Sequence, residues 1–186
     1  MSEIISEINA RRARRALSEE PVDQEALDRV FGAAIMAASC SNKQPWRFLV
    51  CTTDGSIDDA REALTPGNYW ARKAPVLVVV MTANELDCQL NDERNYAWFD
   101  TGMAVAHLLL QATREGLYAH PMAGFNPMVL REKFDIGSET RIITMVAIGK
   151  PGDSSHLNEK HLESEKSERT RKPIDEVVSR ESWTGL

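Results

Sequence analysis

Residues 39–46 read Ser39-Cys40-Ser41-Asn42-Lys43-Gln44-Pro45-Trp46 and are the most informative stretch of the chain. They follow a strongly periodic helical pattern and precede a β-type run, so they predict a turn between a helix and a strand. Asn42 and Gln44 each carry a donor and an acceptor in one amide, which suits the edge of a heterocycle. The plainer alternative is a turn that satisfies its own polar groups, and for Trp46 we favour a core position. The turn is therefore a candidate site for a polar ligand.

The segments around this turn predict interleaved helices and strands. Apolar residues spaced at 27, 30, 31, 34, 35 and 38 indicate one buried face of a helix that Asp23 caps. We expect a central strand over 75–81, and helices over 57–64, over 93–115 with a stop at Gly116, and over 127–134 with Pro127 in the first turn. Further strands are expected over 46–53, 118–124 and 142–148. Their irregular spacing favours an α+β fold over a doubly wound sheet.

Composition places the chain among single-domain proteins with a full-sized core. It has 186 residues, of which 42% are hydrophobic, and a formal net charge of -6. The first ten residues are acidic and lack a continuous apolar segment, and no apolar run is long enough to span a bilayer, so we expect no leader, no membrane association and a cytoplasmic location. The three cysteines suggest free thiols, and no metal-binding or nucleotide-binding motif is present.

Two basic clusters stand out in this acidic chain. Residues 11–15 read Arg-Arg-Ala-Arg-Arg, and residues 169–172 read Arg-Thr-Arg-Lys. The first cluster alone is explained by solvated salt bridges to neighbours such as Glu19 and Glu20. Together they predict one clamp for a phosphate, because guanidinium groups match its geometry. A small anion suits them better than nucleic acid, which the net charge repels.

The C-terminal segment has an unusual composition. From Asp153 to Lys172 it contains almost no apolar residue, whereas apolar character returns at Ile174, Val177 and Val178. Such a segment has no core of its own, so it is disordered or lies over another surface. We favour a single domain over 1–186, with 151–186 forming an arm whose apolar tip docks elsewhere.

Five elements resemble, in order and spacing, the FMN-dependent nitroreductase family, and together they span most of the chain. The Asn-x-Gln-Pro-Trp motif is the most specific of the five. They are Arg11-Arg12-Ala13-x-Arg15, Ser39-Cys40-Ser41-Asn42-x-Gln44-Pro45-Trp46, Pro121-Met122-Ala123-Gly124-Phe125, Gly149-Lys150-Pro151 and Arg169-Thr170-Arg171-Lys172-Pro173.

The resemblance implies an α+β fold with a mainly antiparallel sheet wrapped by helices. It also implies a homodimer whose C-terminal arms embrace the partner, with two FMN sites at the subunit interface. The implied FMN contacts are Arg11, Arg12, Arg169 and Arg171 at the phosphate and ribityl end, Arg15 at the pyrimidine edge, Ser39, Cys40, Ser41 and Asn42 from the other subunit, Gln44 supporting that loop, and Met122, Ala123 and Gly124 beside the ring. Ala13 and Ala123 stand where other members carry a serine and a glutamate.

The implied activity is reduction of small planar acceptors, such as nitroaromatics or quinones, by NADH or NADPH in a ping-pong mechanism. No catalytic side chain is required, because the flavin carries the chemistry. One alternative within the fold is specialised flavin chemistry, such as dehalogenation, dehydrogenation or flavin fragmentation. Another, of a different class, is a non-enzymatic module that binds anions or nucleic acid. Tyr69, Trp70, Tyr96 and Trp98 are candidates to cover the flavin, with core positions as the alternative.

Overall fold

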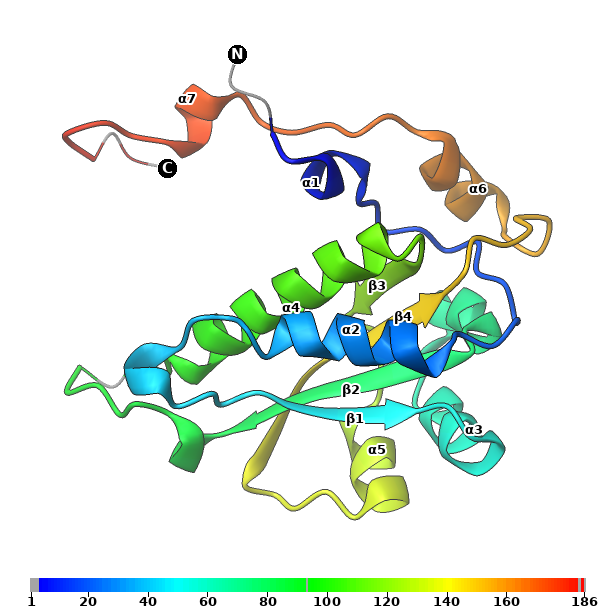
Figure 1. Ribbon diagram of the computed structural model, residues 1–186, viewed down its shortest axis with the longest axis horizontal. Coiled ribbons are helices and arrows are strands. Elements are labelled where there is room, and N and C mark those ends of the chain that lie inside the picture. The colour runs from blue at the N-terminus through cyan, green and yellow to red at the C-terminus, as the bar shows by residue number, and fades with distance from the viewer. Residues whose placement is uncertain (1–3, 93, 184, 186) are drawn as a thin grey trace.

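The computed structural model describes residues 4–92, 94–183 and 185, and its centre is a four-stranded sheet (Figure 1). The strands lie in the order β1-β2-β4-β3, and every neighbouring pair is antiparallel. Their bounds are Arg47–Cys51 for β1, Val76–Ala83 for β2, Tyr118–Met122 for β3 and Thr140–Gly149 for β4. This architecture confirms the predicted α+β class with a mainly antiparallel sheet.

Helices cover both faces of the sheet, and β2 shows why. Successive strand residues point to opposite faces, and nearly every residue of β2 is apolar and buried. Val76, Val78 and Val80 pack with α2 (Gln24–Ala34) and α4 (Ala97–Arg114). Leu77 and Val79 pack on the other face, with residues of α3 (Asp54–Glu62), α5 (Pro127–Phe134) and the 3-10 segment η2 (Pro66–Lys73). The central position predicted for this strand is confirmed.

Most helix ends follow the local signals of the sequence. The Asp23 carboxylate accepts a hydrogen bond from the Ala26 N–H at 3.3 Å and caps α2. Pro127 is the first residue of α5, and Gly116, with φ of 73°, follows the end of α4. α3 differs from the prediction, because it begins at Asp54 rather than at residue 57.

The start of α4 also differs from the prediction. Its predicted first residue, Glu93, lies outside the described residues, and the helix itself begins at Ala97. The Asp87 carboxylate accepts hydrogen bonds from the N–H groups of Tyr96 and Ala97, each at 3.1 Å. A carboxylate ten residues upstream therefore caps the helix, which local periodicity does not reveal.

The C-terminal segment divides into two parts. In the first part, Leu157 is buried in the core of its own chain, and the Asn158 N–H donates to the Tyr69 hydroxyl at 2.7 Å. This places α6 (Glu159–Lys166) on the body of the same chain, so the predicted arm over 151–186 separates from the body only after α6. The second part runs past α1 (Ser6–Ala10) to α7 (Ile174–Val177), which stands clear of the sheet (Figure 1). None of the described helices combines the length and apolar character needed to cross a bilayer.

Candidate functional site

Two arginine-bearing segments from opposite ends of the sequence line one surface cavity of about 240 Å³. The first segment follows α1. The second follows α6 and runs past α1 in Figure 1. The structure thus brings together most of the residues predicted to hold a phosphate. The lining residues with that predicted role or next to it are Arg11, Arg12, Ala13, Arg14, Arg169 and Arg171.

Arg169 and Arg171 make different contacts at this cavity. The Arg169 guanidinium donates to the backbone carbonyls of Ile8 at 2.9 Å and Asn9 at 3.1 Å, and also to that of Arg11. Carbonyls at the C-terminal end of a helix lack helical partners, so these bonds cap α1. Among the described residues, the exposed Arg171 side chain bonds only the preceding backbone carbonyl, at 2.6 Å. Arg169 therefore fastens the arm to α1, whereas Arg171 keeps most of its donors for a ligand.

The arginine side chains that line the cavity lie close enough to repel one another. Burial lowers the pKa of Arg169, and the neighbouring charges of Arg12, Arg11 and Arg171 lower it further. The Arg169 Nε atom is buried and, within the described part of the chain, has no hydrogen-bond partner. An unsatisfied donor among repelling cations is an arrangement that an anion would stabilise.

Glu165 of α6 sets the backbone path of the first arginine segment. Its carboxylate accepts hydrogen bonds from the N–H of Arg15 and from the N–H of Ala16 at 3.3 Å, and it lies 3.4 Å from Arg14 Nη1. Its side chain is only 10% exposed. This role could not be predicted from the sequence, because Glu165 lies in a run of charged residues that resembles a solvated helix.

Arg15 is held against the core by an aromatic stack. Its guanidinium carbon lies 5.8 Å from the centroid of the Trp70 ring, and that ring packs against His120 at a centroid separation of 4.5 Å. His120 Nδ1 lies 3.0 Å from the Arg14 carbonyl oxygen. Burial lowers the pKa of His120 to about 4, so the ring is neutral at pH 7 and can donate this bond. β3 and the arginine segment are joined in this way.

The segment predicted to pass beside the ring lies at the end of β3. Met122 is buried, whereas Ala123 is exposed. The Gly124 carbonyl accepts hydrogen bonds from Thr65 Oγ1 at 2.9 Å and Asn68 Nδ2 at 2.8 Å. A Cβ at Gly124 would approach Thr65 Oγ1 to 2.7 Å and Asn68 Nδ2 to 2.8 Å, so any larger residue here would displace the side chains that hold this turn. Because Asn68 belongs to η2, as does Trp70, one short segment supports both this turn and Arg15.

The turn at 39–44 has an unusual backbone. It contains the 3-10 turn η1 (Cys40–Asn42), and φ is positive at Ser41 (49°), Asn42 (55°) and Gln44 (47°). The Gln44 N–H donates to Ser39 Oγ at 3.0 Å, and Gln44 Nε2 donates to Asn42 Oδ1 at 3.2 Å. Gln44 therefore supports the loop. Left-handed conformations in residues other than glycine are uncommon and are concentrated at functional sites.

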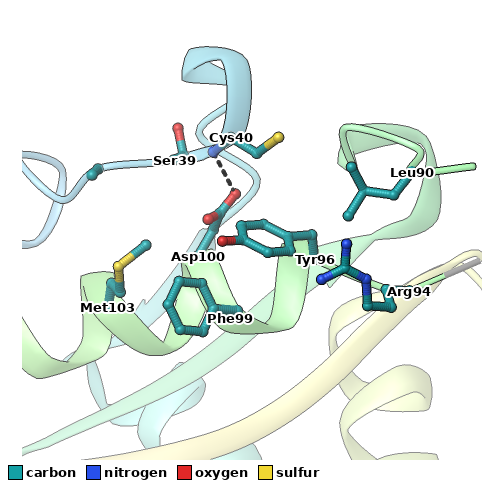
Figure 2. Close-up of a pocket in the computed structure, with 9 residues that line it drawn as sticks. Ser39, Cys40, Leu90, Arg94, Tyr96, Phe99, Asp100 and Met103 are labelled. Atoms are coloured by element: carbon teal, nitrogen blue, oxygen red, sulfur yellow. Dashed lines mark hydrogen bonds between the residues drawn. The ribbon is translucent and has the colours of Figure 1, made fainter. Parts of the chain in front are cut away.

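Asp100 anchors this turn to α4. Its Oδ2 accepts a hydrogen bond from the Cys40 N–H at 2.9 Å, drawn as the dashed line in Figure 2. The residue is 1% exposed, and its Oδ1 is buried with no partner within the described part of the chain. Sequence reasoning did not select Asp100. The available signal was a single carboxylate within the apolar stretch that begins α4.

A second cavity, of about 600 Å³, lies beside the turn. Figure 2 shows aromatic and apolar side chains around it, with the Arg94 guanidinium at one side. Tyr96 is thus a cavity residue, and Trp98 is 47% exposed, whereas Trp70 is a core residue and Tyr69 holds α6. The residues that line the cavity are Ala38, Ser39, Cys40, Leu90, Arg94, Tyr96, Phe99, Asp100 and Met103.

The two halves of the predicted site lie apart in one chain. The arginine cavity is beside α1 and α6, whereas the 39–44 turn is at the far end of α2 (Figure 1). The residues that line the two cavities do not overlap. Within one chain, the two predicted sets of residues therefore line separate cavities.

Known proteins share both the sequence pattern and the fold. A "Putative NADH dehydrogenase/NAD(P)H nitroreductase" of Archaeoglobus fulgidus is 27% identical over 165 residues, which cover 86% of this chain and 91% of that protein. A "5,6-dimethylbenzimidazole synthase" of Rhodospirillum rubrum is 27% identical over 177 residues, covering 80% and 82%. A solved structure described as an oxidoreductase containing FMN has a TM-score of 0.86 and 32% identity, covering 99% of this chain and 94% of that one.

The model of the nitroreductase family matches residues 8–66 and 57–150. These ranges contain the first arginine segment, the 39–44 turn and the end of β3, which are three of the five elements that suggested the resemblance. The C-terminal arm follows the matched region. With a match over most of its length, this chain belongs to the nitroreductase family, which confirms the resemblance and the prediction of an oxidoreductase enzyme.

Proposed function

We propose that the protein is an FMN-dependent oxidoreductase that takes hydride from NADH or NADPH and reduces small planar acceptors, such as nitroaromatics or quinones, in a ping-pong sequence. The observation that carries this proposal is the cavity that Arg11, Arg12 and Arg171 line in a chain of net charge -6. The net charge disfavours nucleic acid, and membership in an enzyme family disfavours a purely binding role. The cytoplasm, which contains both nicotinamide donors, stays the predicted location.

The residues of the arginine cavity fit the phosphate end of FMN. Arg171 has free donors, the Arg169 Nε is buried without a partner among the described residues, and like charges repel one another there. A dianionic phosphate would satisfy these groups in bidentate geometry. We expect FMN rather than FAD, because the cavity of about 240 Å³ suits a phosphate and has no evident adenosine pocket.

The isoalloxazine ring of FMN supplies the hydride-accepting group when the cofactor is bound. Arg15 would place a fixed cation beside the ring, because Glu165 holds its backbone and Trp70 supports its guanidinium. A preorganised cation stabilises the negative charge that the ring gains on reduction. Met122, Ala123 and Gly124 would lie along the ring, where the Thr65 and Asn68 contacts keep the backbone fixed.

The 39–44 turn would complete the site from a second subunit. Within a single chain, this turn lies apart from the arginine cavity. In the proposed homodimer, the turn of one subunit contacts the cofactor of the other through Ser39, Cys40, Ser41 and Asn42. In that arrangement the second cavity adjoins the ring and admits the acceptor. Its aromatic lining by Tyr96 and Phe99 suits planar substrates.

An apolar face on α4 supports the homodimer. Phe99 is 57% exposed, and the face continues along the helix through Gly102, Met103, Ala106 and Leu110. Small residues four positions apart allow two helices to approach closely. The tip of the arm is also apolar and exposed, at Ile174 (67%) and at Val177 and Val178. We propose that the two α4 helices pack together and that each arm tip docks on the partner.

Specialised flavin chemistry is a second candidate, and one relative favours it. The Rhodospirillum rubrum protein similar to this chain is named for synthesis of 5,6-dimethylbenzimidazole, and the similarity covers 80% of the chain. An enzyme of that type would consume reduced flavin instead of transferring its electrons to an acceptor. The two candidates share the cofactor site and differ in turnover.

An absorption spectrum of the purified protein tests the shared part of both candidates. We expect a yellow protein that releases FMN on denaturation and whose flavin absorbance is bleached by NADH or NADPH under anaerobic conditions. Restoration of the absorbance by a quinone or nitroaromatic supports the reductase. Loss of flavin and appearance of a benzimidazole in air supports the second candidate. A colourless protein that takes up no added FMN would contradict both.

A further inference from the structure

The second cavity carries a single guanidinium group. Among the described residues that line it, Arg94 alone has a positive charge. Its Nε donates to Asp92 Oδ2 at 2.6 Å, and within the described part of the chain its two terminal nitrogens bond no acceptor. A carboxylate bound at one edge of a guanidinium leaves the other donors free for a second planar anion. Arg94 therefore keeps hydrogen-bond donors for a ligand in this cavity.

The opposite charge lies at another side of the cavity, on Asp100. This residue is 1% exposed, its Oδ2 accepts the Cys40 N–H at 2.9 Å, and its Oδ1 has no partner among the described residues. In Figure 2 the Tyr96 ring lies between the Asp100 carboxylate and the Arg94 guanidinium. A carboxylate repels an anion beside it, whereas a guanidinium attracts one. A ligand with one anionic end would therefore place that end at Arg94.

The lining between the two charges is mostly aromatic and aliphatic. The Tyr96 and Phe99 rings pack with their centroids 5.1 Å apart, and Leu90, Met103 and Ala38 complete the apolar lining. The volume of about 600 Å³ lies within the range of sites that hold small molecules. An aromatic acid combines the apolar ring and the anionic end that such a cavity can bind.

We propose that the second cavity selects planar acceptors that carry a carboxylate or a sulfonate, and that Arg94 determines this specificity. The inference rests on the proposed function, in which this cavity adjoins the flavin and admits the acceptor. In the proposed dimer the flavin lies against the 39–44 turn, so the reducible nitro group or quinone carbonyl would face Ser39 and Cys40. The acidic group would lie at Arg94. An acceptor with these two groups at opposite ends of one ring, such as 4-nitrobenzoate, meets both conditions.

Equilibrium binding of two matched ligands to the oxidised, flavin-containing protein tests this proposal. 4-Nitrobenzoate and 4-nitrobenzamide have nearly the same shape and differ by one negative charge at neutral pH. We expect the carboxylate to bind about tenfold more tightly at low salt, which is the effect of one hydrogen bond to a charged group. The ratio should fall as salt is added, because the Arg94 side chain is 65% exposed. Arg94→Gln should abolish the preference, and Arg94→Lys should keep part of it.

Arg72→Gln is the matched control and should keep the wild-type ratio. Arg72 is an exposed arginine of η2, which precedes the start of β2, and it does not line the cavity. Equal binding of the two ligands by the wild type, or a preference that survives in Arg94→Gln, would overturn the proposal.

Reoxidation of the reduced flavin by the same two compounds separates this inference from the proposed function. If both compounds reoxidise the flavin with equal kcat/KM, the reductase proposal stands and selection by Arg94 is wrong. If neither reoxidises it while the carboxylate still binds more tightly through Arg94, the reductase proposal fails and the assignment of an anion-selective cavity holds.

Discussion

Replacing Arg171 by alanine separates direct phosphate binding from the support of the arm. Its side chain is exposed, and among the described residues its only hydrogen bond is to a neighbouring carbonyl. Arg171→Ala therefore removes few contacts from the folded chain, and we expect the free energy of unfolding to change by no more than about 0.5 kcal/mol. The substitution should instead lower the affinity for FMN.

The magnitude follows from the contact that is removed. A hydrogen bond to a charged group contributes about 1.5–3 kcal/mol, and 1.4 kcal/mol corresponds to a tenfold change in affinity. Arg171→Ala should therefore raise the dissociation constant of FMN about 10- to 150-fold. Arg171→Lys should have an intermediate effect, because it keeps the charge and loses the planar fork.

Fluorescence titration of FMN into the apoprotein measures this change, with Arg141→Ala as the control. Arg141 is an exposed arginine in the first part of β4, so its removal changes the net charge equally without touching the cavity. Arg169→Ala provides the contrast: it removes the carbonyl bonds that hold the arm, so it should weaken FMN binding and also raise hydrogen exchange in α1. An unchanged dissociation constant for Arg171→Ala would refute the phosphate assignment of the arm.

Three further predictions concern pH, the dimer and the arm. Burial lowers the pKa of His120 in the folded chain to about 4, below its ordinary 6.5, so between these pH values the unfolded chain binds more protons than the folded one. The free energy of unfolding should therefore fall by about 3 kcal/mol as the pH drops from 6.5 to 4. Urea denaturation at several pH values should show this dependence for the wild type, and His120→Asn should lack the contribution of His120. Gly102→Glu should give monomers with less bound FMN in sedimentation experiments, whereas Gly55→Glu, at an equally open helix position in α3, should stay dimeric. Truncation after Lys172 removes α7 but keeps Leu157 and both arginine clusters, so it should weaken the dimer while preserving the fold; a full dimer with full flavin content would contradict docking of the tip.

Local chemistry explains why most of the fold could be predicted. The apolar run of β2, the Asp23 cap, Pro127 and Gly116 each specify a conformation through neighbouring residues alone. The start of α4 could not be predicted in this way, because Asp87 caps it from a separate segment. Sequence periodicity reports which face of a helix is buried and is silent about caps from distant residues.

In the candidate site, too, some roles could be predicted from the sequence and others could not. The arginine clusters and the polar turn are visible in the sequence because their composition departs from that of the rest of the chain. Glu165 and Asp100 are not, because their importance depends on which backbone N–H groups they reach. Composition alone left open whether the polar segment after residue 153 is disordered or lies over another surface, and burial of Leu157 with the Tyr69 contact places its first part on its own chain.

The two roles of the arm are linked through electrostatics. By bonding the carbonyls at the end of α1, Arg169 brings its own charge and that of Arg171 next to Arg11 and Arg12. Burial lowers the pKa of Arg169, and the repulsion from these neighbouring charges lowers it further. Hydrogen bonds to α1 thus hold together cations that would otherwise separate, and a bound phosphate would relieve the same repulsion. Cofactor binding and closure of the arm against α1 are therefore expected to strengthen each other, since each stabilises the geometry that the other requires.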